Sequence, residues 1–261
     1  MSTVVVTGAV SGIGRGIALG AAARGRHVAL LDIDERALED AAAAILDAGA
    51  ASALPLVCDV SDEHEVDAAF GAIVDRMPVI SGVVANAGIE VSEPLADASV
   101  ESWERVMAVN LRGTFLTSRA AVGYWRDQRS GGSLVCISSP SAFVGFAGGG
   151  NTAYGASKGG ISAFVRAAAL DAAPDGVRVN AVVPGATDTD ILYFGLEGEA
   201  LSARRAELED AAKRQIPLGR MARPEEIADA VLWLLSEESA YVTGTHLVCD
   251  GGLLAKSANT F

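Results

Sequence analysis

The chain has 261 residues, of which 50% are hydrophobic, and a formal net charge of −13. This charge disfavours nucleic acid and anionic membrane surfaces as partners, because both repel an acidic protein. No apolar run approaches the roughly 18 residues of a transmembrane helix, and the N-terminus lacks the basic and apolar regions of a secretory signal. The sequence therefore predicts a cytoplasmic protein without a membrane partner.

Short apolar runs alternate with helix-like stretches along the chain. Buried parallel strands have such a composition, often rich in Val. We expect seven strands, at Val4–Val6, His27–Leu31, Leu54–Cys58, Val79–Ala85, Ser133–Ile137, Val177–Val182 and His246–Val248. We expect helices between them, at Ile13–Ala23, Glu35–Leu46, Glu63–Arg76, Val100–Gln128, Ala153–Ala172 and Pro224–Leu235.

This alternation predicts an α/β fold, a doubly wound (Rossmann-like) parallel sheet of seven strands with helices on both faces. Asp34 and Ser61 are the expected N-caps of the second and third helices, and Pro224 fits the first turn of the last. No linker or repeat divides the sequence, so a single domain over residues 1–261 is expected.

A glycine turn follows the first strand, with Gly8, Gly12 and Gly14 spaced as G-x-x-x-G-x-G. The spacing differs from G-x-G-x-x-G, but the mechanics are related. Glycine permits close approach of the backbone to a pyrophosphate, and the start of the next helix offers free amides. We therefore expect a dinucleotide site here, with Ser11 and Ile13 among its contacts.

Asp32 ends the second strand and is followed by Ile33. A carboxylate at this position can accept hydrogen bonds from an adenosine ribose and would repel a 2′-phosphate. The residue before Gly12 is Ser11 rather than an arginine. Both features favour NAD over NADP as the cofactor, with contacts from Asp32 and Ile33. The alternative for Asp32 is a cap at the end of its strand.

Tyr154 and Lys158 are four residues apart, which places them on one face of a helix. Free tyrosine has a pKa of about 10, and a neighbouring ammonium would lower it. The phenol could then exchange a proton with an alcohol or carbonyl while hydride moves. Ser139, at the preceding strand end, could donate a hydrogen bond to the same substrate oxygen. The alternative is a surface Tyr and Lys on an ordinary helix.

The cysteines and histidines give no sign of a metal centre. They are few and form no cluster with ligand spacing, so no catalytic metal is expected. The cysteines lie mostly within apolar runs and are expected to be reduced core thiols. The residues concerned are Cys58, Cys136, Cys249, His27, His64 and His246.

Taken in order, these motifs resemble the classical short-chain dehydrogenase/reductase family from Val4 to about Gly252. The resemblance depends on several elements that occur in a fixed order. They are Thr7-Gly8-x-x-x-Gly12-Ile13-Gly14, Cys58-Asp59-Val60, Asn86-Ala87-Gly88, Asn110, Ser139, Tyr154-x-x-x-Lys158, Pro184-Gly185 and Asp250-Gly251-Gly252.

The resemblance implies the catalytic roles. Tyr154 would be the acid/base, and Lys158 would lower its pKa and hold the nicotinamide ribose. Ser139 would polarise the substrate, although Ser138 and Ser141 remain open as alternatives. Asn110 would hold a relay water through a local helix distortion; otherwise it is an ordinary polar helix residue.

The resemblance also implies the remaining cofactor contacts. Asp59 and Val60 would line the adenine pocket, and Asn86, Ala87 and Gly88 would close over the adenosine ribose. Asn86 could instead be structural and bridge strands. Beyond the Pro184-Gly185 turn, Thr187 would contact the nicotinamide carboxamide and Thr189 the phosphates.

A substrate lid is expected at about residues 188–215, with Tyr193, Phe194 and Leu196 facing the substrate or packing within the lid. Phe143 and Phe146 would add apolar surface on the opposite rim. Ser139 and Tyr154 are separated by more residues than is usual in the family, with extra length at 148–150. No Arg or Lys lies clearly in the pocket-forming segments, which favours a neutral substrate.

These features predict an NAD-dependent oxidoreductase for a neutral, cyclic or apolar secondary alcohol or ketone. The alternative is an NAD-binding, non-redox or sensor protein on the same fold. The resemblance implies a homotetramer. Small residues in the helices around 100–128 and 153–172 would permit close helix packing.

Overall fold

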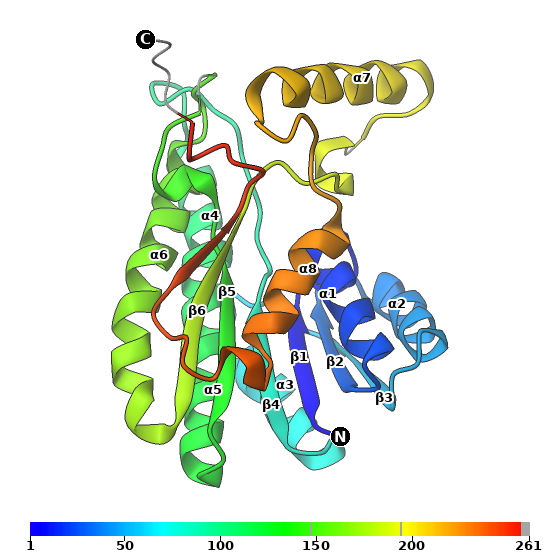
Figure 1. Ribbon diagram of the computed structural model, residues 1–261, viewed down its shortest axis with the longest axis vertical. Coiled ribbons are helices and arrows are strands. Elements are labelled where there is room, and N and C mark those ends of the chain that lie inside the picture. Colours follow the sequence, from blue (N-terminus) through cyan, green and yellow to red (C-terminus); the bar gives the residue numbers. More distant parts are fainter. Residues whose placement is uncertain (147, 194, 257–261) are drawn as a thin grey trace.

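The computed structural model describes residues 1–146, 148–193 and 195–256. At its centre is a seven-stranded sheet of order β3-β2-β1-β4-β5-β6-β7 (Figure 1). All neighbouring strands pair in parallel. The strands are β1 (Thr3–Thr7), β2 (His27–Asp32), β3 (Ser52–Val57), β4 (Ile80–Ala85), β5 (Gly132–Ile137), β6 (Val177–Pro184) and β7 (His246–Cys249). The predicted doubly wound α/β fold is confirmed.

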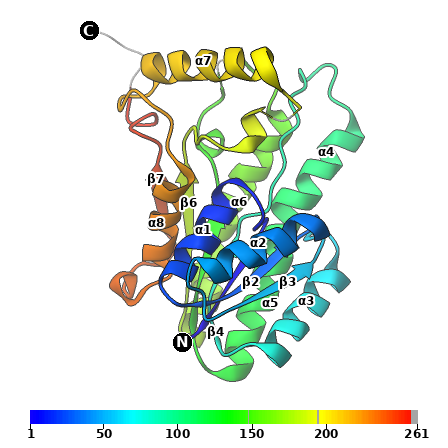
Figure 2. The same ribbon diagram turned by 90° about the vertical axis from the view of Figure 1, so that its right-hand side faces the viewer.

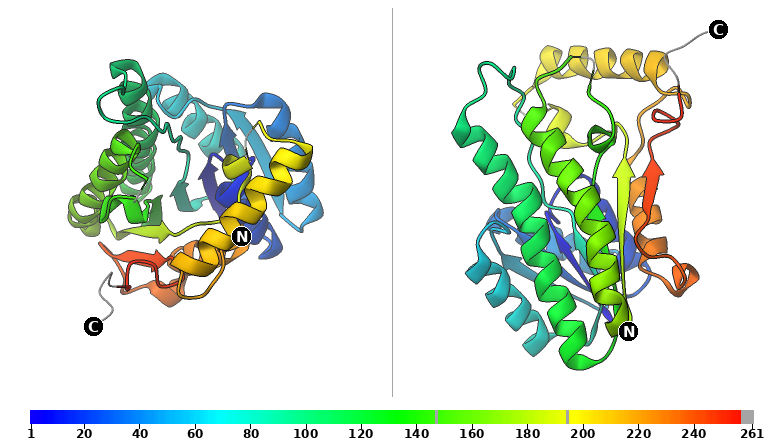
Figure 3. Two further views of the ribbon diagram at one scale, coloured as in Figure 1. Left: turned by 90° about the horizontal axis from the view of Figure 1, so that it is seen from above. Right: turned by 90° about the vertical axis from the view of Figure 1, so that its left-hand side faces the viewer.

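Helices cover both faces of the sheet, because the central strands are apolar on both sides. On one face, α3 (Glu63–Arg76), α5 (Gly113–Gln128) and α6 (Thr152–Ala172) pack in one hydrophobic cluster, with α5 and α6 in front in the right-hand view of Figure 3. On the other face, a second cluster contains α1 (Gly12–Ala23), α2 (Glu35–Asp47) and α8 (Pro224–Leu234) (Figure 2). Trp125 anchors the first cluster: it is fully buried, and its indole Nε1 donates to the Ile80 carbonyl oxygen at 2.8 Å.

The strand order reverses direction between β1 and β4. From β1 the chain winds outward to β3, then returns to β4 on the other side of β1. The loops after β1 and β4 therefore diverge, and in open parallel sheets ligands bind in the crevice this leaves at the carboxyl ends of the strands. Helix α7 (Gly198–Gln215) lies beyond this same end of the sheet (Figures 1 and 2).

Two local predictions differ from the structure. The third helix is capped by Asp62 rather than Ser61, because the Asp62 carboxylate accepts hydrogen bonds from the amides of His64 and Glu65. The helix expected at 100–128 is divided into α4 (Val100–Val106), a π-helix η1 (Met107–Arg112) and α5. The Asp34 cap of α2 and Pro224 in the first turn of α8 are as expected.

Within the described residues, no helix combines the length and the apolar character that crossing a bilayer requires.

Candidate active site

A cleft of about 1110 Å³ lies at the carboxyl ends of the strands. Segments that are distant in the sequence line it, and most of the predicted site residues meet there. These are Gly8, Ser11, Gly12, Ile13, Asp32, Ile33, Asp59, Val60, Asn86, Ala87, Gly88, Ser139, Tyr154, Lys158, Pro184, Gly185, Thr187 and Thr189. Gly14 and Asn110 are buried and do not line the cleft.

The glycine turn packs too tightly for side chains. Gly8 has a left-handed φ of +62°, and a Cβ on it would lie 2.9 Å from the Ala87 Cα. A Cβ on Gly14 would lie 1.9 Å from the Gly8 carbonyl oxygen. Ser11 is the N-cap of α1 and its side chain makes no cap hydrogen bond. The turn therefore leaves the amino end of α1 open to the cleft, as a phosphate-binding turn requires.

Asn86 joins the ends of the two central strands. Its Nδ2 donates to the carbonyl oxygens of Thr7 (2.9 Å) and Gly8 (3.1 Å). The Thr7 hydroxyl in turn accepts from the amides of Asn86 and Ala87. The side-chain amide of Asn86 therefore has the structural role that was the alternative prediction, because it links the ends of β1 and β4. The residue also lines the cleft.

Asp32 organises the loop at the end of β2. Its Oδ1 accepts from the amides of Ile33 (2.8 Å) and Asp34 (3.3 Å), and its Oδ2 accepts from the Val10 amide at 3.4 Å. Asp34, rather than Asp32, caps α2. The Asp32 carboxylate thus faces the glycine turn and can still accept hydrogen bonds from a ribose.

Asp59 and Val60, which follow β3, also line the cleft. The Asp59 Oδ1 accepts from the Ser61 amide at 2.8 Å, which fixes the carboxylate. Val60 is buried at 6% exposure. A fixed acceptor beside an apolar side chain suits an adenine ring, which is flat and carries an amino donor.

Asn110 lies in the π-helix η1 and is completely buried. Its Oδ1 accepts from the Ile89 amide (2.8 Å), and its Nδ2 donates to the Ile89 carbonyl oxygen (2.9 Å) and to Ser157 Oγ (3.1 Å). The side chain thus holds the loop after β4 against α6. The helix distortion expected around Asn110 is present as this π-helix.

Lys158 is buried between α6 and β5. Its Nζ donates to the Ile137 carbonyl oxygen at 2.8 Å and lies 5.4 Å from the centre of the Tyr154 ring. Burial lowers the pKa of Lys158 to about 8, against weaker opposing effects of Cys136 and Glu90. The predicted Tyr-Lys pair therefore shares one face of α6.

The pKa of Tyr154 differs from the prediction. The pKa of Tyr154 is raised to about 12, mainly by burial and also by the negative charge of Glu90, while hydrogen bonding to Ser139 opposes both effects. The i, i+4 spacing predicted a lowered pKa for Tyr154, whereas burial is the largest effect on this group and its pKa is raised. The Lys158 ammonium lies over the face of the Tyr154 ring and donates a hydrogen bond to the Ile137 carbonyl oxygen. Burial also lowers the pKa of Lys158 itself.

The structure separates the three candidate serines. The Ser138 hydroxyl is buried, with hydrogen bonds to the Lys158 carbonyl oxygen (3.2 Å) and to Ser162 Oγ (2.9 Å). Ser141 Oγ is buried without a partner among the described residues. Ser139 caps the short helix η2 (Pro140–Ala142), and its hydroxyl interacts with Tyr154. Of the three, Ser139 has the geometry of a substrate donor.

The lid residues divide between the cleft and the lid itself. Thr187 and Thr189 line the cleft, and Thr189 would meet any Cβ on Gly12 at 3.2 Å. Tyr193 instead packs within the lid: its hydroxyl donates to Asp188 Oδ1 at 2.7 Å, and Arg205 covers its ring. Leu192 lines the cleft in its place. Phe194 lies outside the described residues.

The opposite rim also differs in part from the prediction. Phe146 lines the cleft together with Val144. Phe143 turns away and packs edge-on against His246, with ring centres 5.9 Å apart.

Three charged residues of the cleft were missed: Glu90, Arg105 and Lys256. The expectation that no Arg or Lys approaches the pocket is therefore wrong. Glu90 could have been found, because it stands two residues after the Asn86-Ala87-Gly88 segment. Arg105 precedes Val109 by one helical turn, which places both on one face. No sequence signal indicates Lys256, which the fold of the C-terminal segment brings to the cleft.

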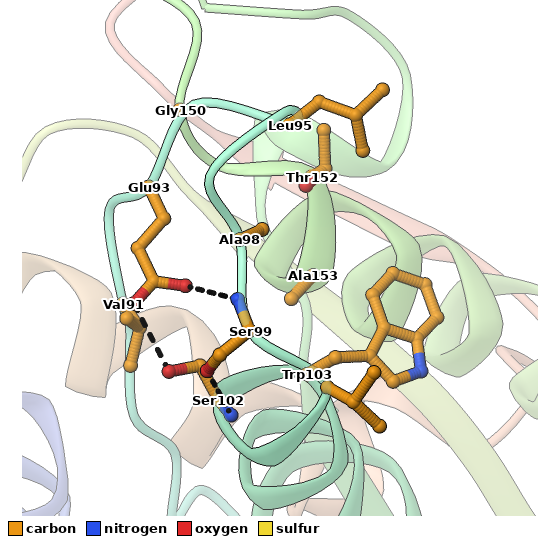
Figure 4. Close-up of a pocket in the computed structure, with 11 residues that line it drawn as sticks. Val91, Glu93, Leu95, Ala98, Ser99, Ser102, Trp103, Gly150, Thr152 and Ala153 are labelled. Atoms are coloured by element: carbon orange, nitrogen blue, oxygen red, sulfur yellow. Dashed lines mark hydrogen bonds between the residues drawn. The ribbon is translucent and has the colours of Figure 1, made fainter.

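The extra glycines at 148–150 belong to a loop whose C-terminal end is hydrogen-bonded to the segment around Glu93. The Glu93 amide donates to the Gly150 carbonyl oxygen at 2.7 Å. The Glu93 carboxylate accepts from the Ser99 amide (3.2 Å) and the Ser102 hydroxyl (3.1 Å), as Figure 4 shows. A small pocket of about 200 Å³ lies between these segments. The longer loop between Ser139 and Tyr154 is therefore hydrogen-bonded to the segment that precedes α4.

Across the described residues, no three His, Cys, Asp or Glu side chains gather as metal ligands would. Burial raises the pKa of the thiols of Cys58 and Cys136 to about 12, so both stay protonated and unreactive.

Comparison with known proteins agrees with this geometry. Residues 8–254 match the family model described as Enoyl-(Acyl carrier protein) reductase. The chain is 37% identical over 252 residues to 2-(S)-hydroxypropyl-CoM dehydrogenase 3 of Xanthobacter autotrophicus, covering 97% of this chain and 96% of the relative. It is 40% identical over 252 residues to cis-4-hydroxycyclohexanecarboxylate dehydrogenase of Sinomonas cyclohexanicum, covering 96% of each.

The fold agrees as well. The crystal structure of levodione reductase superposes with a TM-score of 0.91 at 33% identity, covering 98% of each chain. Together with the glycine turn and the Tyr154–Lys158 pair, these matches show that the chain belongs to the short-chain dehydrogenase/reductase family.

Proposed function

We propose that this protein is an NAD-dependent oxidoreductase that transfers hydride between nicotinamide and a neutral secondary alcohol or ketone. One observation carries the proposal: Ser139, Tyr154 and Lys158 line the same cleft as the glycine turn after β1. A proton-transfer group and a dinucleotide site thus share one space. The relatives named as dehydrogenases of hydroxy compounds support the same reaction class.

The residues present fit a dinucleotide. The crowded turn at Gly8 and Gly14 leaves its backbone facing the cleft, and the amino end of α1 is open. Asp32, beside this turn, would accept the ribose hydroxyls and repel a 2′-phosphate, which favours NAD. A bound oxidised nicotinamide supplies the hydride acceptor and a positive charge that favours the Tyr154 phenolate.

Each of the site's side chains would then have a separate role in alcohol oxidation. As the carbinol C–H leaves as hydride, Tyr154 accepts the hydroxyl proton, and the substrate oxygen becomes a carbonyl. Ser139 donates a hydrogen bond to that oxygen. Lys158, whose ammonium lies over the Tyr154 ring, helps to position the phenol and offers a hydrogen-bond donor to the cofactor ribose. A water held by the helix distortion around Asn110 would pass the proton onward.

The rim of the cleft supports an apolar or cyclic substrate. Val144, Phe146, Leu192, Leu253 and Leu254 contribute apolar side chains to its lining. Relatives named for cyclohexane carboxylates and for levodione support a ring in the substrate. The lid at 188–215 would exclude water from the reaction.

A homotetramer remains a proposal. Exposed apolar side chains on α5 and α6, such as Phe115 at 45% and Leu170 at 78% exposure, support association through this face.

The test is the formation of reduced cofactor from NAD or NADP with a panel of cyclic and acyclic secondary alcohols, run beside Tyr154→Phe. We expect turnover with NAD that falls by about 10²–10⁴-fold in the variant, while NAD binding by calorimetry is retained. NAD binding without turnover of any alcohol would favour the sensor alternative. Because the matching family model is described as an enoyl reductase, the panel includes a short enoyl thioester with NADH.

A further inference from the structure

Glu90 occupies a fixed place at the catalytic end of the cleft. The backbone before it is held twice: Asn86 is bound to the end of β1, and Ile89 is bound on both its amide and its carbonyl by Asn110. Between them, a Cβ on Gly88 would lie 3.5 Å from Lys158 Nζ. The chain therefore enters the cleft beside Lys158, and Glu90 lines it together with Ser139 and Tyr154.

The Glu90 carboxylate makes no hydrogen bond or ion pair with any other described residue. This distinguishes it from the other two carboxylates of the cleft, because Asp32 and Asp59 both accept hydrogen bonds from backbone amides. Those two stabilise loops, whereas the position of Glu90 serves no visible structural purpose. Glu90 is exposed at the surface of the cleft, so its carboxylate is free to accept a hydrogen bond from a ligand there.

The charge of Glu90 acts on the reacting groups. It raises the pKa of the Tyr154 phenol and opposes the lowering of the Lys158 pKa. Partial desolvation by the surrounding cleft also raises the pKa of Glu90 itself, while Lys158 lowers it. These directions agree with the geometry, in which Glu90 lines the cleft with Tyr154 and Lys158 and follows Gly88, whose Cβ would lie 3.5 Å from Lys158 Nζ.

We propose that Glu90 determines specificity: its carboxylate accepts a hydrogen bond from a second donor group on the substrate, such as a further hydroxyl. The inference rests on the proposed oxidoreductase function and narrows it to alcohols that carry a hydrogen-bond donor. A hydrogen bond to a carboxylate is about twice as strong as one between neutral groups. A substrate carboxylate would meet like charge at Glu90, while Arg105, Lys158 and Lys256 bring positive charge to the same cleft. The difference between the wild type and a Glu90 variant therefore isolates the effect of this carboxylate. The chain would thus differ from its Sinomonas relative, whose name specifies a hydroxycyclohexanecarboxylate.

The test uses a matched series of ring alcohols: cyclohexanol and its 3- and 4-substituted forms bearing a hydroxyl, an ammonium or a carboxylate. Values of kcat/KM with NAD are measured for the wild type, Glu90→Gln and Glu104→Gln. Glu104→Gln is the control, because it removes an exposed carboxylate on α4 that does not line the cleft. Circular dichroism and urea unfolding establish that each variant is folded.

We expect the wild type to prefer the ammonium alcohols over the carboxylates, and the diols over cyclohexanol. In Glu90→Gln the ratio of kcat/KM for the ammonium alcohols to that for the carboxylates should fall at least tenfold. The kcat/KM for the diols should fall by a smaller factor, because glutamine keeps an acceptor oxygen. Glu104→Gln should keep the wild-type ratio. A ratio in Glu90→Gln within about twofold of the wild type, or a wild-type preference for carboxylates, overturns the inference.

A binding experiment distinguishes failure of the proposed oxidoreductase function from failure of the Glu90 inference. If no alcohol in the series is turned over by the wild type, calorimetry measures the binding of 4-aminocyclohexanol and 4-hydroxycyclohexanecarboxylate to the protein saturated with NADH. Tighter binding of the amine that is lost in Glu90→Gln supports the recognition role even without turnover. Equal binding of the two compounds, or a preference unchanged in Glu90→Gln, overturns it.

Discussion

The Asn110 carboxamide binds both polar groups of Ile89. Its Oδ1 accepts from the Ile89 amide at 2.8 Å, and its Nδ2 donates to the Ile89 carbonyl oxygen at 2.9 Å. The two residues come from different elements, the π-helix η1 and the loop after β4. This pairing sets the distance between the helix distortion and the segment that carries Gly88 and Glu90 into the cleft.

Replacing Asn110 should therefore destabilise the protein as well as the site. Asn110→Ala leaves the Ile89 amide and carbonyl without their partner, so we expect a loss of about 2–4 kcal/mol in the free energy of unfolding, measured with urea. Asn151→Ala is the control, because its buried Nδ2 has no hydrogen-bond partner among the described residues. Similar losses in both variants would contradict the proposed role of the pairing.

The pH profile of alcohol oxidation should move when Glu90 is neutralised. Glu90 raises the pKa of Tyr154, so the phenol keeps its proton to higher pH and accepts one from the substrate only at more alkaline pH. Glu90→Gln removes that negative charge, while Ser139 and Lys158 remain around the phenol. The rising limb of kcat/KM for cyclohexanol against pH should therefore shift to lower pH. A shift to higher pH would show that another group sets this limb.

The charge of Asp32 should decide between the two nicotinamide cofactors. Asp32→Asn keeps an acceptor oxygen for the Ile33 and Asp34 amides but no longer repels a 2′-phosphate. We expect the kcat/KM ratio of NAD over NADP to fall about tenfold or more, which corresponds to roughly 1.4 kcal/mol. Asp34→Asn, which removes the neighbouring charge and keeps a good helix cap, should leave the ratio near that of the wild type.

The Glu93 side chain should stabilise the longer loop before Tyr154. Glu93→Ala removes the acceptors of the Ser99 amide and the Ser102 hydroxyl, at an expected cost of about 1–2 kcal/mol in unfolding free energy. Because Gly150 is bound to the Glu93 backbone, we also expect KM to rise more than kcat falls. Glu101→Ala, an exposed residue of α4, is the matched control, and equal effects in both variants would contradict this role.

Much of the fold could be predicted because it depends on local patterns. Val-rich runs such as Val4–Val6 fit only buried strands, and their alternation with helices specifies a parallel sheet. The glycines of the first turn were recognisable because no other residue tolerates that crowding. The spacing of Tyr154 and Lys158 placed them on one helix face, and the structure confirms this.

The assignments that failed or stayed open depend on neighbours that are distant in the sequence. The choice of Ser139 over Ser138 follows from the contacts of Ser138 with α6. Tyr193 turned into the lid because Asp188 and Arg205 hold its ring and hydroxyl. In each case the decisive partner was brought close by folding.

By itself, the sequence determined the strand and helix succession, the glycine turn and the placement of Tyr154 and Lys158 on one helix face, since all of these follow from spacing along a regular backbone. Only the tertiary structure decided the electrostatics of that pair. The pKa of Tyr154 is raised because α6 is buried against the sheet and because Asn110 fixes the loop that brings Glu90 to it. Burial and charge act through space, and the distances that govern them exist only in the folded chain.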